Sequence, residues 1–234
     1  AYVDAQVGRM LNFIDDRKLT DSTLIIFSSD HGSELWDHGI GNDKHTFLDA
    51  SLRVPLLMRL PGVLPANSTQ QFATTLDITA TILGAAGADI PADYQGFDLF
   101  SPMSRGGSSP RRIGIASEYR AHAVVTPTWK LAFFPEQGEG RLWNRVEDPN
   151  EQINLFDRSD AATSRVRNGL TTALLRWRAL QDPLGYLQAN FMPGAQTATN
   201  AYNHTKYLRG IDAELILQND ALQFESPLAN SFVV

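Results

Sequence analysis

The chain has 234 residues, 43% of them hydrophobic and 20% charged, which is the composition of a packed globular protein and the length of one large or two small domains. Its net charge of −6, without a basic stripe, argues against nucleic-acid binding, and no apolar run approaches the roughly 18 residues of a membrane-spanning helix. Cysteine is absent, which excludes disulfides and thiolate-bound zinc within this sequence and leaves the redox compartment open. The sequence begins with Ala rather than Met, so it says nothing about a signal peptide, and the cellular compartment also stays open.

The first half of the chain predicts helices and strands in alternation. Apolar residues at helical spacing predict a helix over 2–18, and a run of apolar and β-branched residues predicts a buried strand of a parallel sheet over 23–28. A second strand is expected over 54–59, stopped by a Pro-Gly pair. Asp77 is expected to cap a helix that ends near residue 84 or 87.

The second half predicts a smaller antiparallel unit. Residues 89–110 are rich in Gly, Pro and Ser, which indicates a surface crossing. Strands near 112–118, 121–126 and 129–135 are expected to form an antiparallel sheet, and a helix over 160–181 is expected to cover it.

Ionisable residues gather directly after the strand predicted at 23–28. That strand ends in Asp30, His31 and Gly32, and residues 30–45 contain three His, three Asp, one Glu and one Lys. In open α/β sheets the carboxyl ends of the strands are where ligands bind. Because so many charges are costly to hold together beside a core strand, the cluster predicts a divalent metal and an anion; a solvated loop is the alternative interpretation.

Four short motifs follow one another in this region. They are Ser-Asp-His-Gly at 29–32, Asp-His-Gly at 37–39, Lys-His-Thr at 44–46 and Arg-Val-Pro-Leu at 53–56. In this order they resemble the sulfatases of the alkaline phosphatase superfamily. The similarity covers residues 1 to about 180 and includes further matches at 2–9, 76–87, 95–99, 129–131, 142–144 and 148–155.

The resemblance implies an α/β fold class. Residues 1–105 are expected to be the C-terminal part of a catalytic domain with an alkaline-phosphatase-like mixed or parallel sheet and flanking helices. Residues 106–183 are expected to form a small α+β subdomain, an antiparallel sheet with a packed helix. Residues 184–234 are a tail extension whose role is left open.

The resemblance also implies a metal site. Asp30 and His31 are expected to be metal ligands, as half of a site completed by an upstream Asp pair and the nucleophile. Oxygen ligands favour Ca²⁺, with Mg²⁺ or Mn²⁺ as alternatives. Since imidazole is an unusual Ca²⁺ ligand, a hydrogen bond from His31 to the sulfate or the nucleophile is the second interpretation.

Three further residues are assigned to catalysis. Lys44 is expected to bind a sulfate oxygen and to stabilise charge that develops in the transition state. His38 and His45 are candidates for a general acid toward the leaving alkoxide, because imidazole titrates near neutral pH. Hydrogen bonding behind the site is the favoured alternative for both. Trp129 and Lys130 are interpreted as structural residues that start a strand.

The nucleophile itself is not found. In the family it is a formylglycine, made from the Cys or Ser of a Cys-x-Pro-x-Arg or Ser-x-Pro-x-Arg motif upstream of the metal motif. The run 108–112 matches the Ser form literally, but it lacks the Thr-Gly that completes the motif and it follows the metal motif. We therefore expect the chain to be the C-terminal part of a longer enzyme, inactive without its N-terminal part.

Three functions remain at this point. The leading one is part of a sulfatase that hydrolyses sulfate monoesters of a small molecule or carbohydrate. The second is a phosphonate monoester or phosphodiester hydrolase of the same superfamily, although the Lys-His-Thr motif favours sulfate. The third is a truncated, non-catalytic interaction subunit, for which the aromatic residues of the 184–234 tail are a candidate homo-oligomer surface.

Overall fold

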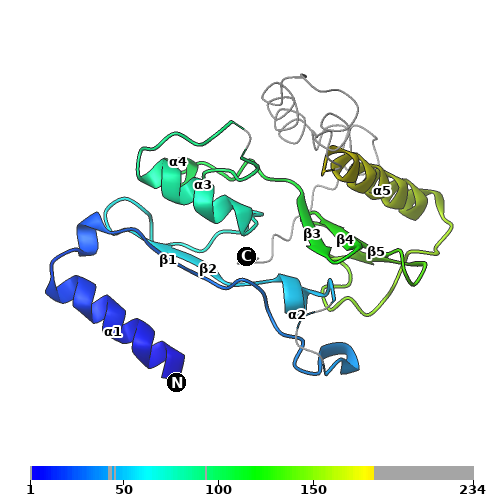
Figure 1. The fold of residues 1–234 in the computed structure, drawn as a ribbon, viewed down its shortest axis with the longest axis horizontal. Helices are drawn as coiled ribbons and strands as arrows, with labels where there is room; N and C mark the ends of the chain where they lie inside the picture. Colours follow the sequence, from blue (N-terminus) through cyan, green and yellow to red (C-terminus); the bar gives the residue numbers. More distant parts are fainter. Residues whose placement is uncertain (1, 42–43, 45, 93, 182–234) are drawn as a thin grey trace, which may run out of the picture.

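The computed structural model describes residues 2–41, 44, 46–92 and 94–181 (Figure 1). The predictions for His45 and for the tail from 184 onward concern residues outside these ranges. Helix α1 (Tyr2–Asp16) and strand β1 (Ile25–Ser28) confirm the first two predicted elements. No helix within the described ranges is long and apolar enough to cross a membrane.

Strand β1 pairs with β2 (Leu56–Arg59). The two strands are antiparallel, with Ile25 opposite Arg59 and Ser28 opposite Leu56, so the expectation of a parallel partner for β1 is not met in the described part of the chain. The prediction that this strand is buried also fails in part, because the Phe27 side chain is 42% exposed. An apolar run in the sequence indicates that a strand tends to be buried, but it does not give the direction of the neighbouring strand. That direction depends on the segment between β1 and β2, which contains helix α2 (Asp49–Leu52).

Helix α3 (Leu76–Ala85) confirms the next predicted helix and its end. The N-cap position is Thr75 rather than Asp77, which lies inside the first turn. The Asp77 carboxylate instead accepts hydrogen bonds from the backbone N–H groups of Thr74 and Phe97, each at 2.8 Å. The predicted surface crossing also contains a short helix, α4 (Phe100–Ser104).

The second half of the chain forms a four-stranded antiparallel sheet in the order β3-β4-β5-β6. Its strands are β3 (Gly114–Glu118), β4 (Ala121–Val125), β5 (Trp129–Phe134) and β6 (Glu139–Asn144). The three predicted strands are confirmed, and β6 adds a fourth to the edge of the sheet.

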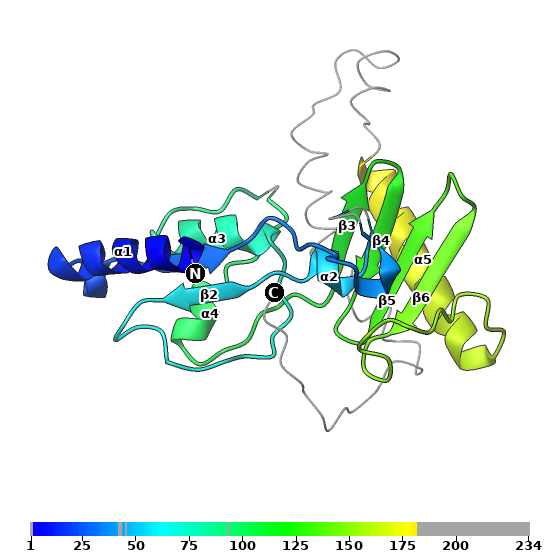
Figure 2. The same cartoon turned by 90° about the horizontal axis from the view of Figure 1, so that it is seen from below.

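One face of this sheet packs against helix α5 (Ala161–Gln181), as Figure 2 shows. Side chains alternate between the two faces of a strand, and the apolar members of this face build the larger core. That core consists of Val124, Trp129, Leu131, Leu142, Val166, Leu170 and Leu174.

The opposite face is covered by a segment from the first half of the chain. Residues 46–52, which include α2, pack there against side chains of β4, β5 and β6 (Figure 2). This second core consists of Phe47, Leu48, Ala123, Ala132 and Trp143. Residues 46–52 therefore lie directly on the four-stranded sheet.

Asp160 caps helix α5. Its carboxylate accepts hydrogen bonds from the backbone N–H of Thr163 at 2.9 Å and from the Thr163 hydroxyl at 2.8 Å. These hydrogen bonds lower the pKa of Asp160 below its ordinary value. A lowered folded-state pKa means that the stabilisation is complete above the unfolded-state pKa and is lost as pH falls through the folded-state pKa.

We expect Asp160→Ala to lower the melting temperature near neutral pH by about 2–4 °C, with a smaller difference in strong acid. Asp160→Asn is the control, because Asn also caps helices and lacks the titrating group. Thermal unfolding followed by circular dichroism measures all three proteins. Equal melting temperatures of Asp160→Ala and the unchanged protein near neutral pH would contradict the assignment.

Candidate active site

The strand-end motif turns sharply after β1. The backbone N–H of Gly32 donates to the carbonyl oxygen of Ser51 at 2.8 Å, which joins the turn to α2. A Cβ atom at Gly32 would lie 2.0 Å from the carbonyl oxygen of Ala50, so a side chain at this position would clash with backbone. The glycine thus lets the Asp-His pair sit close against α2.

Asp30, His31 and Lys44 come together at this turn. The Nδ1 of His31 lies 2.8 Å from the carbonyl oxygen of Gly32, so the geometry favours a proton on Nδ1 and a free lone pair on Nε2. The Lys44 ammonium lies 2.9 Å from that Nε2, which accepts its hydrogen bond. The Asp30 carboxylate oxygen Oδ2 lies 3.4 Å from the same nitrogen.

The Asp30 carboxylate is exposed and ionised. The backbone N–H of His31 donates to its Oδ1 at 3.0 Å, and this hydrogen bond is the main reason that the pKa of Asp30 is lowered. The nearby His31 ring acts in the same direction. The carboxylate therefore keeps its negative charge well into the acidic range and is available to a cation.

These three residues line one cavity of about 590 Å³. The cavity lies between the end of β1, helix α2 and strand β3, and its other polar walls include Thr46, Ser117, Glu118 and Arg145. Apolar side chains such as Phe47, Leu52 and Phe72 complete it. A carboxylate, an imidazole and an ammonium thus share one partly enclosed space.

The donor set fits part of a divalent-metal site. Asp30 supplies a carboxylate and His31 a neutral nitrogen, and both donor atoms point into the same region. Within the described residues no group of three or more His, Cys, Asp or Glu side chains is arranged to hold a metal ion. The assignment of Asp30 and His31 as two ligands of such a site stays a prediction.

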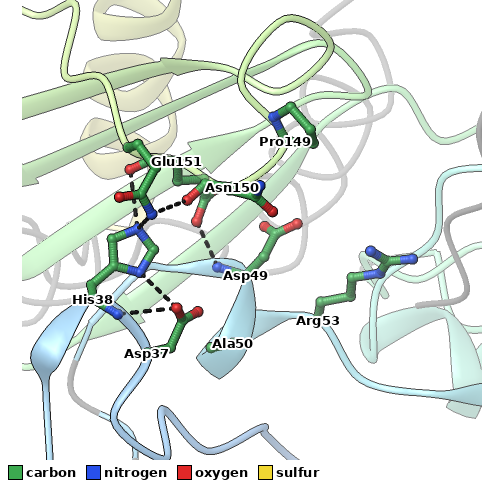
Figure 3. A pocket seen from close by; sticks show the side chains of 9 residues that line it. Asp37, His38, Asp49, Ala50, Arg53, Pro149, Asn150 and Glu151 are labelled. Atoms are coloured by element: carbon green, nitrogen blue, oxygen red, sulfur yellow. Dashed lines mark hydrogen bonds and ion pairs between the residues drawn. The ribbon is translucent and has the colours of Figure 1, made fainter.

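His38 lies in a neighbouring cavity of about 440 Å³ (Figure 3). Its Nε2 is 3.2 Å from the carbonyl oxygen of Glu151 and 2.9 Å from the side-chain amide of Gln152, and its Nδ1 is 3.2 Å from Asp37. Asp37 and Glu151 line this cavity with His38, whereas Asp30, His31 and Lys44 do not. A hydrogen-bonding role for His38 behind the site is consistent with these contacts.

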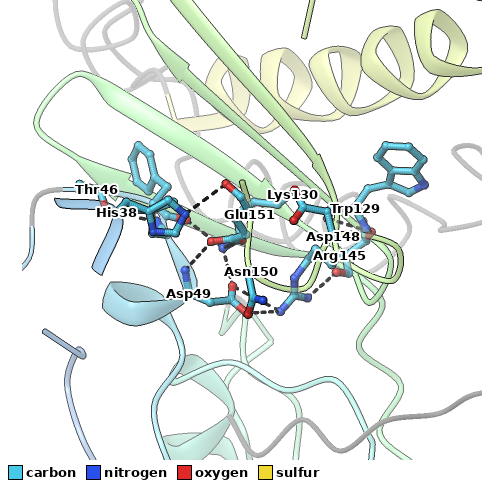
Figure 4. Close-up of polar contacts among 12 residues, drawn as sticks. His38, Thr46, Asp49, Trp129, Lys130, Arg145, Asp148, Asn150 and Glu151 are labelled. Atoms are coloured by element: carbon cyan, nitrogen blue, oxygen red, sulfur yellow. Dashed lines mark hydrogen bonds and ion pairs between the residues drawn. The ribbon is translucent and has the colours of Figure 1, made fainter. Parts of the chain in front are cut away.

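A buried group of charges, which the sequence did not indicate, lies beside both cavities (Figure 4). The fully buried ammonium of Lys130 forms ion pairs with the carboxylates of Asp49 and Glu151. Arg145 adds an ion pair with Asp49 at 3.1 Å. We call Lys130, Asp49, Glu151 and Arg145 the buried charge cluster.

The cluster shifts the titration of its two acids in opposite directions. Burial acts to raise the pKa of Asp49, but the positive charges of Lys130 and Arg145 outweigh it, so this pKa is lowered. Burial, joined by the negative charge of Asp49, raises the pKa of Glu151 despite the attraction of Lys130.

Ser108, the first residue of the literal nucleophile motif, is exposed and does not line the cavity that holds Asp30 and Lys44. In the protein expressed from its complete open reading frame, we expect Ser108→Ala to leave any catalytic activity unchanged, because Ser108 is not among the residues that line this cavity. Steady-state kinetics of the variant protein check this prediction. A total loss of activity would show that Ser108 is the nucleophile.

Comparison with protein families gives a match of residues 1–88 to the family model named Sulfatase. Among curated proteins, the chain is 29% identical over 174 residues to an N-acetylglucosamine-6-O-sulfatase of Bacteroides thetaiotaomicron, a match that covers 68% of the chain and 31% of the relative. It is 30% identical over 167 residues to a choline-sulfatase of Rhizobium meliloti, covering 67% of the chain and 31% of the relative. It is also 30% identical over 205 residues to human arylsulfatase A, covering 72% and 40%.

Two solved structures are also similar to the chain. The chain superimposes with a TM-score of 0.65 and 26% identity on the structure titled BT4656 in complex with its substrate D-glucosamine-2-N,6-O-disulfate, covering 83% of the chain and 40% of that structure. It superimposes with a TM-score of 0.64 and 27% identity on a phosphonate monoester hydrolase of Agrobacterium radiobacter, covering 76% and 39%. The chain thus spans between 31% and 40% of the length of these relatives.

Proposed function

Because the chain belongs to the sulfatase family of the alkaline phosphatase superfamily, we propose that it forms one side of an active site that hydrolyses sulfate monoesters. The observation that carries this proposal is the convergence of Asp30, His31 and Lys44 in one cavity. Three relatives are named as sulfatases for an amino sugar, for choline and for aryl esters, and these names support a small-molecule or carbohydrate sulfate as the substrate.

Each of the three residues has a role that its surroundings support. Asp30 would supply a carboxylate to a divalent cation, and His31 would supply its Nε2 lone pair once the Lys44 ammonium, which contacts that nitrogen in this structure, turns to the sulfate. Ca²⁺ is the first candidate for this cation, and Mg²⁺ or Mn²⁺ are the alternatives. When bound, this cation supplies positive charge opposite the sulfate oxygens. Lys44 donates a hydrogen bond to a sulfate oxygen and stabilises the negative charge that grows there as the ester bond breaks.

We assign no residue of this chain as the nucleophile. The formylglycine of the mechanism, and the further acidic metal ligands, are proposed to be supplied from outside these 234 residues. The isolated chain is accordingly expected to show no turnover of sulfate esters. Turnover by the purified chain, free of contaminating enzyme, would place a nucleophile within it.

The second candidate is hydrolysis of a phosphonate monoester or phosphodiester. The similarity to the phosphonate monoester hydrolase of Agrobacterium radiobacter favours it, at nearly the same TM-score and identity as the structure in complex with D-glucosamine-2-N,6-O-disulfate. Both reactions need a cation and an ammonium opposite an anionic ester. These two groups therefore do not discriminate between sulfate and phosphonate.

The experiment that separates the candidates uses the protein expressed from its complete open reading frame. Initial rates are measured with phenyl sulfate and with phenyl phenylphosphonate, a matched pair of aryl esters. A higher kcat/KM for the sulfate supports the proposal, and a higher value for the phosphonate supports the second candidate. Hydrolysis of neither by a folded, metal-loaded protein would favour the non-catalytic interaction subunit.

A further inference from the structure

The buried charge cluster joins two parts of the chain that are distant in sequence. Lys130 lies on β5, and Asp49 is the first residue of α2. Their side chains form an ion pair between these two elements (Figure 4). The ammonium of Lys130 also donates a hydrogen bond to the carbonyl oxygen of Phe47 at 2.9 Å. Among the described residues, the hydrogen bonds and ion pairs of this ammonium therefore join it to segment 47–49 and to Glu151.

Glu151, in the turn after β6, contacts two segments of the first half of the chain. Its carboxylate accepts a hydrogen bond from the backbone N–H of Asp49 at 2.8 Å. Its backbone carbonyl oxygen lies 3.2 Å from Nε2 of His38. One turn after β6 thus contacts both the loop at 37–39 and the segment 47–49, which lie on the two sides of Lys44 in the sequence.

A buried ammonium in an ion pair generally adds little to the net free energy of folding. Removing charges from water costs several kcal/mol for each ion, and apolar side chains of similar volume often replace a buried ion pair without loss of stability. What such a pair does supply is a defined geometry, since each donor must meet a particular acceptor. We therefore expect these four residues to define the position of segment 47–49 through specific donor–acceptor contacts.

That segment begins close to the candidate active site. Phe47 and Asp49 come three and five residues after Lys44, and Asp49 and Arg145 line the same cavity as Lys44 and His31. A shift of segment 47–49 would displace the nearby backbone of Lys44 and, with it, the ammonium that contacts His31. Small displacements of a positioned group have large effects on rate, of about 10²-fold for about 1 Å.

We propose that Lys130, through the buried charge cluster, is a positioning residue that sets the placement of Lys44 in the active site. On this proposal the four-stranded sheet, which carries Lys130, holds Lys44 in place in addition to packing against α5. This inference rests on the proposed function for the role of Lys44, and on the contacts above for the role of Lys130.

The kinetic test compares Lys130→Met with Arg111→Met in the protein expressed from its complete open reading frame. Both changes remove a buried cation from an ion pair, but Arg111 pairs with Asp77 and donates hydrogen bonds to the carbonyl oxygens of Gln95 and Ile113, away from segment 47–49. We expect Lys130→Met to raise KM for a sulfate ester and the inhibition constant of inorganic sulfate by about tenfold, and Arg111→Met to change both by less than about twofold. A merely structural role would lower the amount of active enzyme in both variants and leave these constants unchanged, which would overturn the proposal.

Two further experiments cover the cases in which Lys130→Met does not fold or the protein hydrolyses no sulfate ester. If Lys130→Met does not fold, Glu151→Gln removes one carboxylate of the cluster at the same shape, and the same rise in both constants, smaller in size, is expected. If the protein hydrolyses no sulfate ester, the proposed function fails, but positioning is still measured by the acetylation rate of Lys44 relative to exposed Lys18. A rise of about threefold or more in the Lys130 variant alone supports positioning, and an unchanged ratio refutes it.

Discussion

Replacement of Lys44 by Ala is expected to reduce kcat/KM for a sulfate ester by about 10²–10³-fold in the protein expressed from its complete open reading frame. The Lys44 ammonium lies 2.9 Å from His31 Nε2, so it reaches the same space as the expected metal ligands. Without it, the charge that develops on the sulfate oxygens loses a positive hydrogen-bond donor. Steady-state kinetics measure the loss.

The matched control for this prediction is Arg120→Ala. Arg120 is also a cation in a turn, but its side chain is 80% exposed and pairs only with the exposed Glu136 in the contacts that the structure gives. Its removal is expected to leave kcat/KM unchanged. If Lys44→Ala behaved like this control, the ammonium would be a solvated loop charge and its assignment to sulfate binding would be wrong.

Replacement of Asp77 by Ala is expected to lower the free energy of unfolding by about 3–5 kcal/mol. Asp77 is fully buried and pairs with the Nη2 of Arg111 at 2.6 Å and with its Nε at 2.7 Å. Its carboxylate also accepts the backbone hydrogen bonds of Thr74 and Phe97. The substitution therefore leaves a buried guanidinium without its carboxylate and two partly buried N–H groups without their acceptor.

Urea-induced unfolding measures this loss, and the double variant Asp77→Ala with Arg111→Met separates its two sources. Removing both ions eliminates the uncompensated guanidinium, so the double variant is expected to be more stable than Asp77→Ala alone. A loss below about 1 kcal/mol for Asp77→Ala would show that water or a shifted side chain replaces the carboxylate.

Elements with a strong local pattern were predictable from the sequence. The helices at α1, α3 and α5 and three strands of the four-stranded sheet follow from periodicity and turn residues, and the structure confirms them. The convergence of Asp30, His31 and Lys44 followed from the resemblance to sulfatases. Their assignment to metal and sulfate binding stays a prediction.

The buried charge cluster was not predictable in the same way. In the strand that begins Trp129-Lys130-Leu131, alternation places Lys130 on the face opposite to the apolar one, where a lysine is normally solvated. That face is buried because residues 46–52, about eighty positions earlier, cover it. A single sequence carries no local signal for such a long-range contact, and the same holds for the antiparallel pairing of β1 with β2.

The most direct measurement is a crystal structure of the protein expressed from its complete open reading frame, grown with Ca²⁺ and sulfate. The account predicts a cation about 2.3–2.6 Å from a carboxylate oxygen of Asp30 and a sulfate oxygen within hydrogen-bond distance of the Lys44 ammonium. A cation and sulfate bound elsewhere, with Asp30 and Lys44 facing solvent, would contradict the assignment of this site.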